Sequence, residues 1–371
     1  MNKPEANVIL NLLVADAQLS QTARDEIEKH YNTLTNYLSN NSTFDSTTYV
    51  QGSVNLGTSI KPITGGTDDY DVDFAVVIPH NSDDNAEVIK TEIGSVLHNS
   101  DRYNERLEEK KRAWRINYSQ SHVDIVPAKA ETSEAEGIIK VTKKNDTNYT
   151  FILSAPEPFA KWFHSKETMD TDTLYSKSIA HREVNKIKDF PKQTRGSILS
   201  RTVQLLKLHR DYMFKDNDQD LKPISMIITI LAAKSYQSET NLIDSLQGFF
   251  TRVMYQFSED NEGHLLLENP VLSTENFTDK WSEYPERKEA FFNWIKQAKE
   301  DIMFYDTLSQ KDYLEKISQK FTNNGENVAK SYGQYFQSIQ KSGNFSYNTS
   351  NGFHVKEQGE KKIPKNTFYG M

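Results

Sequence analysis

A glycine-serine pair and two aspartates at alternate positions mark the run QGSVNLGTSIKPITGGTDDYDVDFAVV, residues 51–77. Asp71 and Asp73 lead straight into an apolar stretch typical of a β-strand, and alternate side chains of a strand share one face. Two carboxylates about 5 Å apart repel each other by roughly 1 kcal/mol in water and by more at protein-like dielectric. We therefore expect cations between them, and hard divalent ions such as Mg²⁺ bind carboxylates together with phosphate oxygens.

The turn upstream of these aspartates suits a phosphate group. Gly52 lets backbone amides approach an anion, and Ser53 adds a hydroxyl donor. With Gln51, they are the candidate nucleotide contacts on this side of the site. The alternative is a solvated, Asp-rich turn, a description that fits Asp68 and Asp69. Asp69 shares the parity of the strand aspartates, but we leave it out because the strand is expected to begin after it.

A third carboxylate is offered by Asp124 in the run HVDIVPA, residues 122–128. Its apolar β-branched neighbours indicate a short strand that Pro127 ends, and residues 114–118 read as the partner strand of a hairpin. Asp124 alone could lie on the solvated face of an edge strand. Together with Asp71 and Asp73 it predicts a site for two Mg²⁺ or Mn²⁺ ions. We expect the nearby His122 to be structural or supporting.

The second half of the chain offers a cation and a helix start. Residues 195–214 have the apolar spacing of an amphipathic helix, and Lys207 lies at the edge of its apolar stripe, where its ammonium could reach a cleft. Downstream, Pro223 and Ser225 suit the first turn of another helix, and free amides with a hydroxyl make an anion site. Taken alone, Lys207 fits a solubility residue better than a phosphate contact, whereas Ser225 fits an ordinary N-cap and a phosphate contact equally well.

These motifs resemble a known family. The glycine-serine turn, the Gly57-Thr58 pair, the Asp-x-Asp strand and the later strand aspartate form the pattern of polymerase-β-like nucleotidyltransferases. More narrowly, the chain resembles the CD-NTase family, the bacterial relatives of animal cyclic GMP-AMP synthase and oligoadenylate synthase. The resemblance implies an α+β fold, with a polymerase-β-like core on a mixed sheet and a C-terminal all-helical lobe. It also implies that Lys207 and Ser225 contact the donor triphosphate opposite the glycine-serine turn.

The activity implied by the resemblance is metal-dependent joining of NTPs, including ATP, with release of pyrophosphate. Repetition of the reaction in one cleft would close a cyclic di- or trinucleotide, a second messenger of CBASS anti-phage defence that acts through a downstream effector. The residues alone indicate only nucleotidyl transfer. Two alternatives stay open: a nucleotidyltransferase that modifies a macromolecule such as tRNA or a protein, and a non-catalytic nucleotide-binding module.

Composition limits the partners and the compartment. The 371 residues carry a net charge of −8 and no cysteine. The charge argues against a large DNA-binding surface, and the lack of thiols excludes disulfides and thiolate zinc sites. No apolar run approaches the roughly 20 residues that span a bilayer, and the amino terminus lacks the features of a signal peptide. We expect a cytoplasmic protein.

Three segments are expected along the chain. Residues 1–175 form the nucleotidyltransferase core with an N-terminal helix, residues 176–345 form the helical domain, and residues 346–371 form a flexible tail. In the resembled family such tails can be conjugated by ubiquitin-transfer-like enzymes, which Gly370 would suit. The expected helices span residues 4–39, 85–97, 158–166, 174–188, 195–214, 227–236, 242–257, 285–305 and 312–321.

Overall fold

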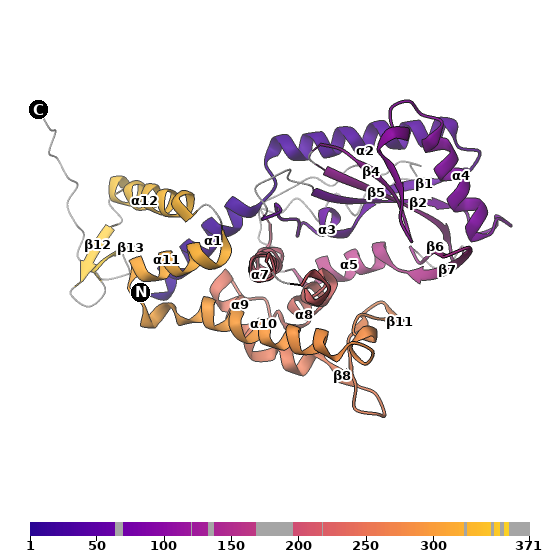
Figure 1. Ribbon diagram of the computed structural model, residues 1–371. Coiled ribbons are helices and arrows are strands. Elements are labelled where there is room, and N and C mark those ends of the chain that lie inside the picture. Colours follow the sequence, from indigo (N-terminus) through magenta and orange to yellow (C-terminus); the bar gives the residue numbers. More distant parts are fainter. Residues whose placement is uncertain are drawn as a thin grey trace, which may run out of the picture.

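The computed structural model describes residues 1–63, 70–119, 121–132, 137–167, 196–216, 218–322, 325–342, 345–348 and 352–355. A lobe built on a β-sheet and a lobe built of helices lie side by side (Figure 1). This is the expected combination of a mixed sheet and a helical C-terminal part. The helix expected over residues 174–188, Asp68, Asp69 and the boundary expected between residues 175 and 176 all lie outside the described residues.

The sheet has seven strands, of which five follow the order β1-β2-β5-β4-β3, while β6 pairs with the second half of β5 and β7 pairs with β6. β2 and β5 are parallel, and all the other pairs are antiparallel, so the sheet is mixed as expected. The strands are β1 Thr47–Gln51, β2 Tyr70–Ile78, β3 Leu107–Glu109, β4 Trp114–Asn117, β5 Ser121–Ala130, β6 Ile139–Asn145 and β7 Asn148–Ser154.

Two helices, α2 (Gln21–Asn41) and α4 (Ala86–His98), cover one face of this sheet (Figure 1). Val72 and Phe74 of β2 are buried in the core beneath them, and the ring of Phe74 meets Tyr31 of α2 edge-on at 4.8 Å between centroids. Because successive side chains of a strand alternate between faces, burial of Val72 and Phe74 turns Asp71 and Asp73 to the opposite face. The hydrophobic pattern of β2 thus directs its carboxylates away from α2.

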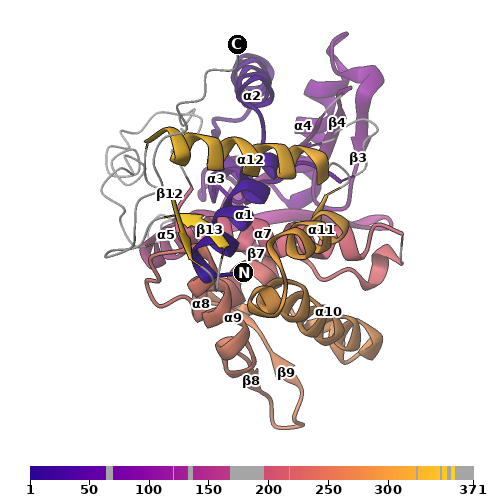
Figure 2. The ribbon, with the colours of Figure 1, turned by 90° about the vertical axis from the view of Figure 1, so that its left-hand side faces the viewer.

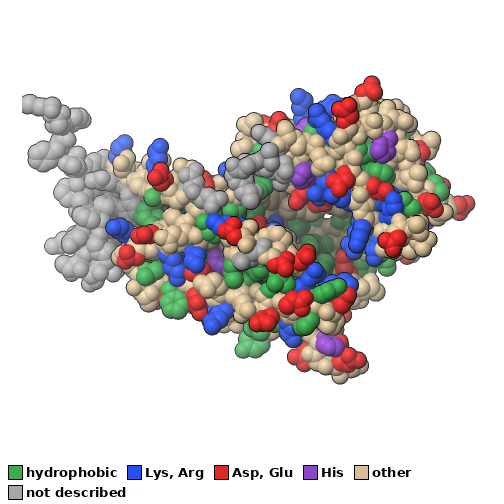
Figure 3. Space-filling view, in the orientation of Figure 1, with side chains coloured by type: hydrophobic (Ala, Val, Ile, Leu, Met, Phe, Trp, Pro, Cys, Tyr) green, Lys and Arg blue, Asp and Glu red, His purple; other side chains and the backbone are tan. Residues whose placement is uncertain are grey.

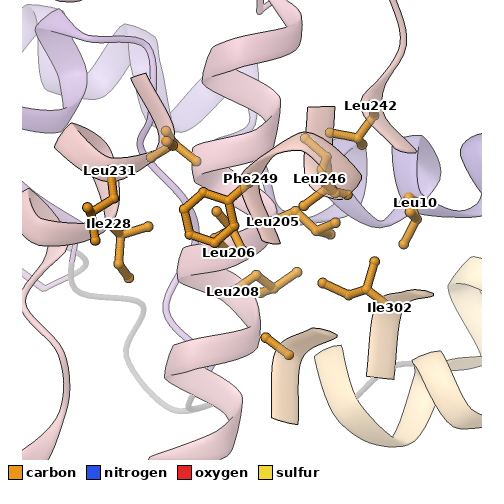
Figure 4. Close-up of a cluster of buried hydrophobic side chains, with 14 of the residues drawn as sticks. Leu10, Leu205, Leu206, Leu208, Ile228, Leu231, Leu242, Leu246, Phe249 and Ile302 are labelled. Carbon is orange, nitrogen blue, oxygen red and sulfur yellow. The ribbon is translucent and has the colours of Figure 1, made fainter. Parts of the chain in front are cut away.

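The helical lobe is arranged around α7, whose side chains Leu205, Leu206 and Leu208 lie at the centre of its core (Figure 4). Residues of α8, α9 and α10 pack on α7 from several sides, and so the helix that carries Lys207 is fixed along most of its length. The long helices outside the sheet lobe are α1 Lys3–Ala17, α5 Pro156–Lys166, α7 Ile198–Met213, α8 Ser225–Ser235, α9 Leu242–Arg252, α10 Pro285–Met303, α11 Gln310–Phe321 and α12 Gly325–Ser342.

The N-terminal segment divides between the two lobes. It was expected to belong wholly to the core lobe, but α1 packs with α7, α9 and α12, and Leu10 and Leu13 are buried in the helical core. Figure 2 shows α12 lying over α1. The chain turns at residues 18–20, and Ser20 caps α2 by accepting a hydrogen bond from the amide of Ala23. The apolar face of α1 thus packs in the helical lobe, whereas that of α2 packs on the sheet.

Short elements interrupt the helices that were expected almost throughout after residue 156. Two small hairpins stand between α9 and α10, and a third, with Phe345 opposite Val355, lies inside the segment expected to be a flexible tail. Its alternating aromatic and polar residues around Asn351-Gly352 are typical of a hairpin. The short elements are α3 Gly52–Asn55, η1 Asn104–Arg106, η2 Gln219–Leu221, η3 Val253–Gln256, η4 Asp279–Trp281, η5 Phe304–Thr307, β8 Ser258–Glu259, β9 Leu265–Leu266, β10 Glu268–Asn269, β11 Leu272–Asn276, β12 Phe345–Asn348 and β13 Gly352–Val355.

Candidate active site

The three aspartates lie together on the sheet face that looks away from α2. Asp73 of β2 stands directly opposite Asp124 in the parallel β2–β5 register, and Asp71 stands opposite His122. Asp71 and Asp73 line a cavity of about 860 Å³ that is also lined by residues of the helical lobe. The surface is hollowed between the lobes, with charged side chains around the hollow (Figure 3). The strand parities read from the sequence therefore bring the predicted carboxylates to one place.

Burial and neighbouring negative charge favour the protonated form of the central aspartate. Burial first, and then the charges of Asp124 and Asp71, raise the pKa of the Asp73 carboxyl to about 7. Arg115 and Lys207 act in the opposite direction but do not cancel it. A carboxyl held in this way gains from any additional cation nearby.

The glycine-serine turn forms the single helical turn α3 at the end of β1, directly beside Asp73. Gly52 has a φ of +66°, a conformation that residues with a side chain rarely adopt, and a Cβ added there would fall onto the Asp73 carboxylate. Gln51, the preceding residue, pairs with Asp73 in the β1–β2 register. Glycine is thus required both by the backbone angle and by the close approach of the turn to the carboxylate.

We expect Gly52→Ala to disable the site by displacing Asp73, in addition to backbone strain of about 1–2 kcal/mol. Gly57→Ala is a matched control, because Gly57 has the same φ of +66° and a Cβ built there meets no atom within 4 Å. Thermal denaturation should show a similar loss of stability in both variants, whereas nucleotidyl transfer should be lost only in Gly52→Ala. Equal activities of the two variants would contradict the close approach to Asp73.

The loop after α3 connects the two lobes at the cavity. Ser53 Oγ lies 3.0 Å from Ser59 Oγ, and both residues line the cavity. Lys207 Nζ of α7 donates to the carbonyl oxygen of Thr58 at 2.9 Å, and Gln204 Nε2 donates to the carbonyl oxygen of Ser59 at 2.9 Å. The turn expected to hold phosphate is therefore fixed to the helix that supplies the opposing cation.

Lys207 is buried, although its position at the edge of the apolar stripe also fitted an ordinary solvated lysine. Burial, with a smaller contribution from the nearby Arg210, lowers the pKa of its ammonium to about 8, and Asp211 and Asp73 act in the opposite direction. The ammonium lines the cavity and is retained there by the Thr58 carbonyl oxygen. An anion entering the cavity would meet a poorly solvated cation, and such a cation interacts strongly with phosphate oxygens.

Ser225 begins α8, as expected, and its hydroxyl is bound by a residue that sequence reasoning missed. Arg210 Nη1 donates to Ser225 Oγ and to the carbonyl oxygen of Pro223, both at 2.9 Å. The N-cap of α8 is Ile224, so Ser225 does not serve as the cap. Arg210 follows Lys207 by three residues on α7 and so shares its side of the helix, a spacing from which its place in the cavity could have been predicted.

A second missed residue is Arg115 of β4, which stands opposite Asp124 in the antiparallel β4–β5 register. Its Nε donates to Asp124 Oδ1 and its Nη2 donates to Asp124 Oδ2, each at 2.7 Å. The same Nη2 lies 3.5 Å from Asp71 Oδ1. The hairpin predicted from the sequence contains the signal needed to find Arg115. Residues 118 and 121 pair beside its turn, and three steps further from the turn residue 115 pairs with residue 124.

Three carboxylates on one face fit a divalent cation by the chemistry of their donor atoms, since Mg²⁺ and Mn²⁺ prefer carboxylate and phosphate oxygens. Among the side chains that the structure describes, no group of three acidic or histidine residues is arranged as a ready-made metal site. The bidentate pair with Arg115 occupies both oxygens of Asp124. The three carboxylates are therefore gathered in one place but not in coordinating positions.

Part of the remaining lining of the cavity is aliphatic, on two sides. Ile60, Pro62 and Ile63 line it from the loop after α3, and Ile224 and Met226 line it from the start of α8. Ile224 is 50% exposed, which is unusual for a large aliphatic side chain. Flat apolar groups such as nucleobases could pack between these two sides.

In the described part of the chain, no helix is both long and apolar enough to cross a membrane.

The fold and the site together define a nucleotidyltransferase, with acidic residues on a mixed sheet facing a basic helical wall across a cavity. Residues 6–167 match the family model described as a Second Messenger Oligonucleotide or Dinucleotide Synthetase domain. A c-di-GMP synthase of Roseivirga ehrenbergii is 26% identical over 366 residues, which cover 95% of this chain and 94% of that protein. Over residues 6–167 the chain is therefore similar to second-messenger synthetases, as the resemblance to the CD-NTase family implied.

Two solved structures share the fold of this chain. The Bradyrhizobium diazoefficiens CD-NTase CdnG in complex with GTP has a TM-score of 0.67 and 16% identity, and the match covers 88% of this chain and 97% of that chain. The CdnC component of the CdnC:HORMA-deltaN complex of E. coli MS115-1 has a TM-score of 0.59 and 14% identity, with coverage of 85% and 96%. Both matches extend over most of the two lobes.

Proposed function

We propose that this protein joins NTPs into a cyclic di- or trinucleotide second messenger for anti-phage defence and releases pyrophosphate. The observation that carries the proposal is the cavity itself, where Asp71 and Asp73 face Lys207 and Ser225 across a space large enough for nucleotides. The match to a second-messenger synthetase domain favours this reaction over modification of a tRNA or a protein. Because the Roseivirga relative is a c-di-GMP synthase, GTP stands beside ATP among the proposed substrates.

Asp71, Asp73 and Asp124 would hold two Mg²⁺ or Mn²⁺ ions together with the phosphates of the donor. Bound metal ions of this kind lower the pKa of an attacking hydroxyl and neutralise charge on the phosphates. The carboxylates of β2 and β5 position the reacting atoms at the face of the sheet. Their fixed register supplies this orientation without rearrangement of the backbone.

The helical wall would bind the donor's β and γ phosphates. Lys207 contributes a buried ammonium, Ser53 and Ser225 contribute hydroxyls, and the amides at the start of α8 belong to residues that line the same cavity. These groups orient the donor so that a ribose hydroxyl of the acceptor attacks the α phosphate and pyrophosphate leaves. Arg210 holds Ser225 and Pro223 in place for this task.

The test is incubation with radiolabelled ATP and GTP, singly and together, with Mg²⁺ or Mn²⁺, followed by phosphatase and chromatography. A small phosphatase-resistant product is the expected result. Label in a macromolecule would indicate the alternative reaction, and no product with or without candidate activators would count against the cyclase. We propose that the reaction takes place in the cytoplasm, where its NTP substrates are found.

We propose that regulatory partners act on this enzyme. The E. coli relative is seen in a complex with a HORMA protein. The partner expected from the sequence is a ubiquitin-transfer-like enzyme that conjugates the tail through Gly370. Deletion of residues 346–371 should leave nucleotide synthesis by the isolated enzyme intact and abolish signalling in cells. Unchanged signalling after the deletion would exclude a role for the tail.

A further inference from the structure

Arg115 stands between two of the carboxylates that are proposed to bind metal. Its guanidinium forms a bidentate pair with Asp124, and its Nη2 also approaches Asp71. The arginine side chain is 24% exposed and that of Asp124 is 17% exposed, so water screens their charges only partly. Hydrogen bonding to Asp124 raises the pKa of Arg115 above its already high normal value, and the guanidinium is therefore always charged.

The pair has two consequences for a divalent ion. In the planar, side-on pair, Arg115 donates a hydrogen bond to each carboxylate oxygen of Asp124. These are the oxygens through which Asp124 would coordinate a metal. The guanidinium also places a fixed positive charge among the three carboxylates, where it reduces their attraction for another cation. Both effects agree with the lack of a ready-made group of three metal ligands in the part of the chain that is described.

We propose that Arg115 is a positioning residue that competes with the metal for Asp124. Without metal it holds Asp124 and Asp71 together and offsets their repulsion. When metal arrives with a nucleotide, Asp124 exchanges its guanidinium for the ion. Divalent ions alone then bind weakly, and occupation of the site depends on the nucleotide. The inference rests on the proposed function, because the metal ligands are assigned there.

The direction of the effect can be measured. Groups that hydrogen-bond a metal ligand alter metal affinity by about 10- to 100-fold when they are replaced, usually by weakening it, because they orient the ligand. Competition predicts the opposite sign. Arg115→Gln should bind Mn²⁺ about tenfold or more tightly than the wild type. Arg115→Lys keeps the positive charge but cannot form the bidentate pair, so its Mn²⁺ affinity should lie between those of the wild type and Arg115→Gln.

The experiment is titration of the nucleotide-free full chain with Mn²⁺, with free Mn²⁺ followed by electron paramagnetic resonance. Arg112→Gln is the matched control, because Arg112 is exposed in the turn before β4 and its replacement should leave Mn²⁺ affinity unchanged. Thermal denaturation without metal should show a lower melting temperature for Arg115→Gln, which saturating Mn²⁺ restores. The Arg115→Lys variant keeps the test valid if the glutamine variant folds poorly.

Two failures are distinguishable. If the wild type binds Mn²⁺ and Arg115→Gln binds it equally or more weakly, competition is wrong while the metal site stands. If neither the wild type nor Arg112→Gln binds Mn²⁺, even with a non-hydrolysable NTP present, the metal assignment is overturned and the role of Arg115 falls with it.

Discussion

Replacing Asp73 by Asn is expected to reduce product formation by at least about a thousandfold, equivalent to roughly 4 kcal/mol of transition-state stabilisation. Asp73 is the central carboxylate, opposite Asp124 and on the same strand face as Asp71. An amide has the same shape but no charge with which to hold the metal ions. Asp71→Asn should have a similar effect, and initial rates of pyrophosphate release would measure both.

The same substitution should not harm the fold. Burial and the two neighbouring carboxylates raise the pKa of Asp73 to about 7, so its charged form is disfavoured in the folded chain. A neutral asparagine of equal size removes this cost and still leaves room for Gly52. We therefore expect the melting temperature of Asp73→Asn to equal or exceed that of the wild type, as is common for residues that serve function at the expense of stability.

Asp101→Asn is a suitable control for the loss of one carboxylate, because Asp101 is exposed in the turn after α4 and does not line the cavity. Its activity should remain at the wild-type level. Substantial cyclic product from Asp73→Asn, with a normal control, would show that the metal ligands lie elsewhere.

Much of the site could be predicted from the sequence because strand parity is a local property. Alternation alone placed Asp71 and Asp73 on one face, and the apolar run around Asp124 identified a second strand. Arg115 was missed because its significance appears only when the register of the β4–β5 hairpin is worked out residue by residue. Arg210 was missed because an arginine on a helix is usually a solvated residue, and only its contact with Ser225 shows otherwise.

The location of the N-terminal helix could not be predicted in the same way. An amphipathic helix shows which face it buries but not the surface against which that face packs. The apolar residues of α1 fit the helical core, whereas those of α2 fit the sheet. That choice depends on the shapes of both lobes, which no local pattern records. The hairpin of β12 and β13 had a local signal, but its polar surroundings favoured a flexible segment.

Replacing Lys207 by Met is the second change with a large expected effect. We expect kcat/KM to fall by about a hundredfold or more, because a buried cation beside the phosphates is a charge-stabilising group of the kind whose removal costs about 2.7–4 kcal/mol. Lys299→Met on the exposed side of α10 is the matched control and should retain wild-type activity. The affinity for a non-hydrolysable NTP should fall together with the rate.

Lys207 also ties α7 to the loop at Thr58, so a purely structural role must be separated from phosphate binding. The pH dependence of the affinity for the NTP analogue distinguishes these two roles. Burial and Arg210 lower the pKa of Lys207 to about 8, while Asp211 and Asp73 act in the opposite sense. The ammonium that would bind phosphate is thus present well below pH 8, half lost near pH 8 and lost as the pH rises further. Affinity for the NTP analogue should decline above pH 8 in the wild type. In Lys207→Arg, which stays protonated, the decline should disappear even if affinity is lower overall. An unchanged decline in Lys207→Arg would assign the lysine to structure alone.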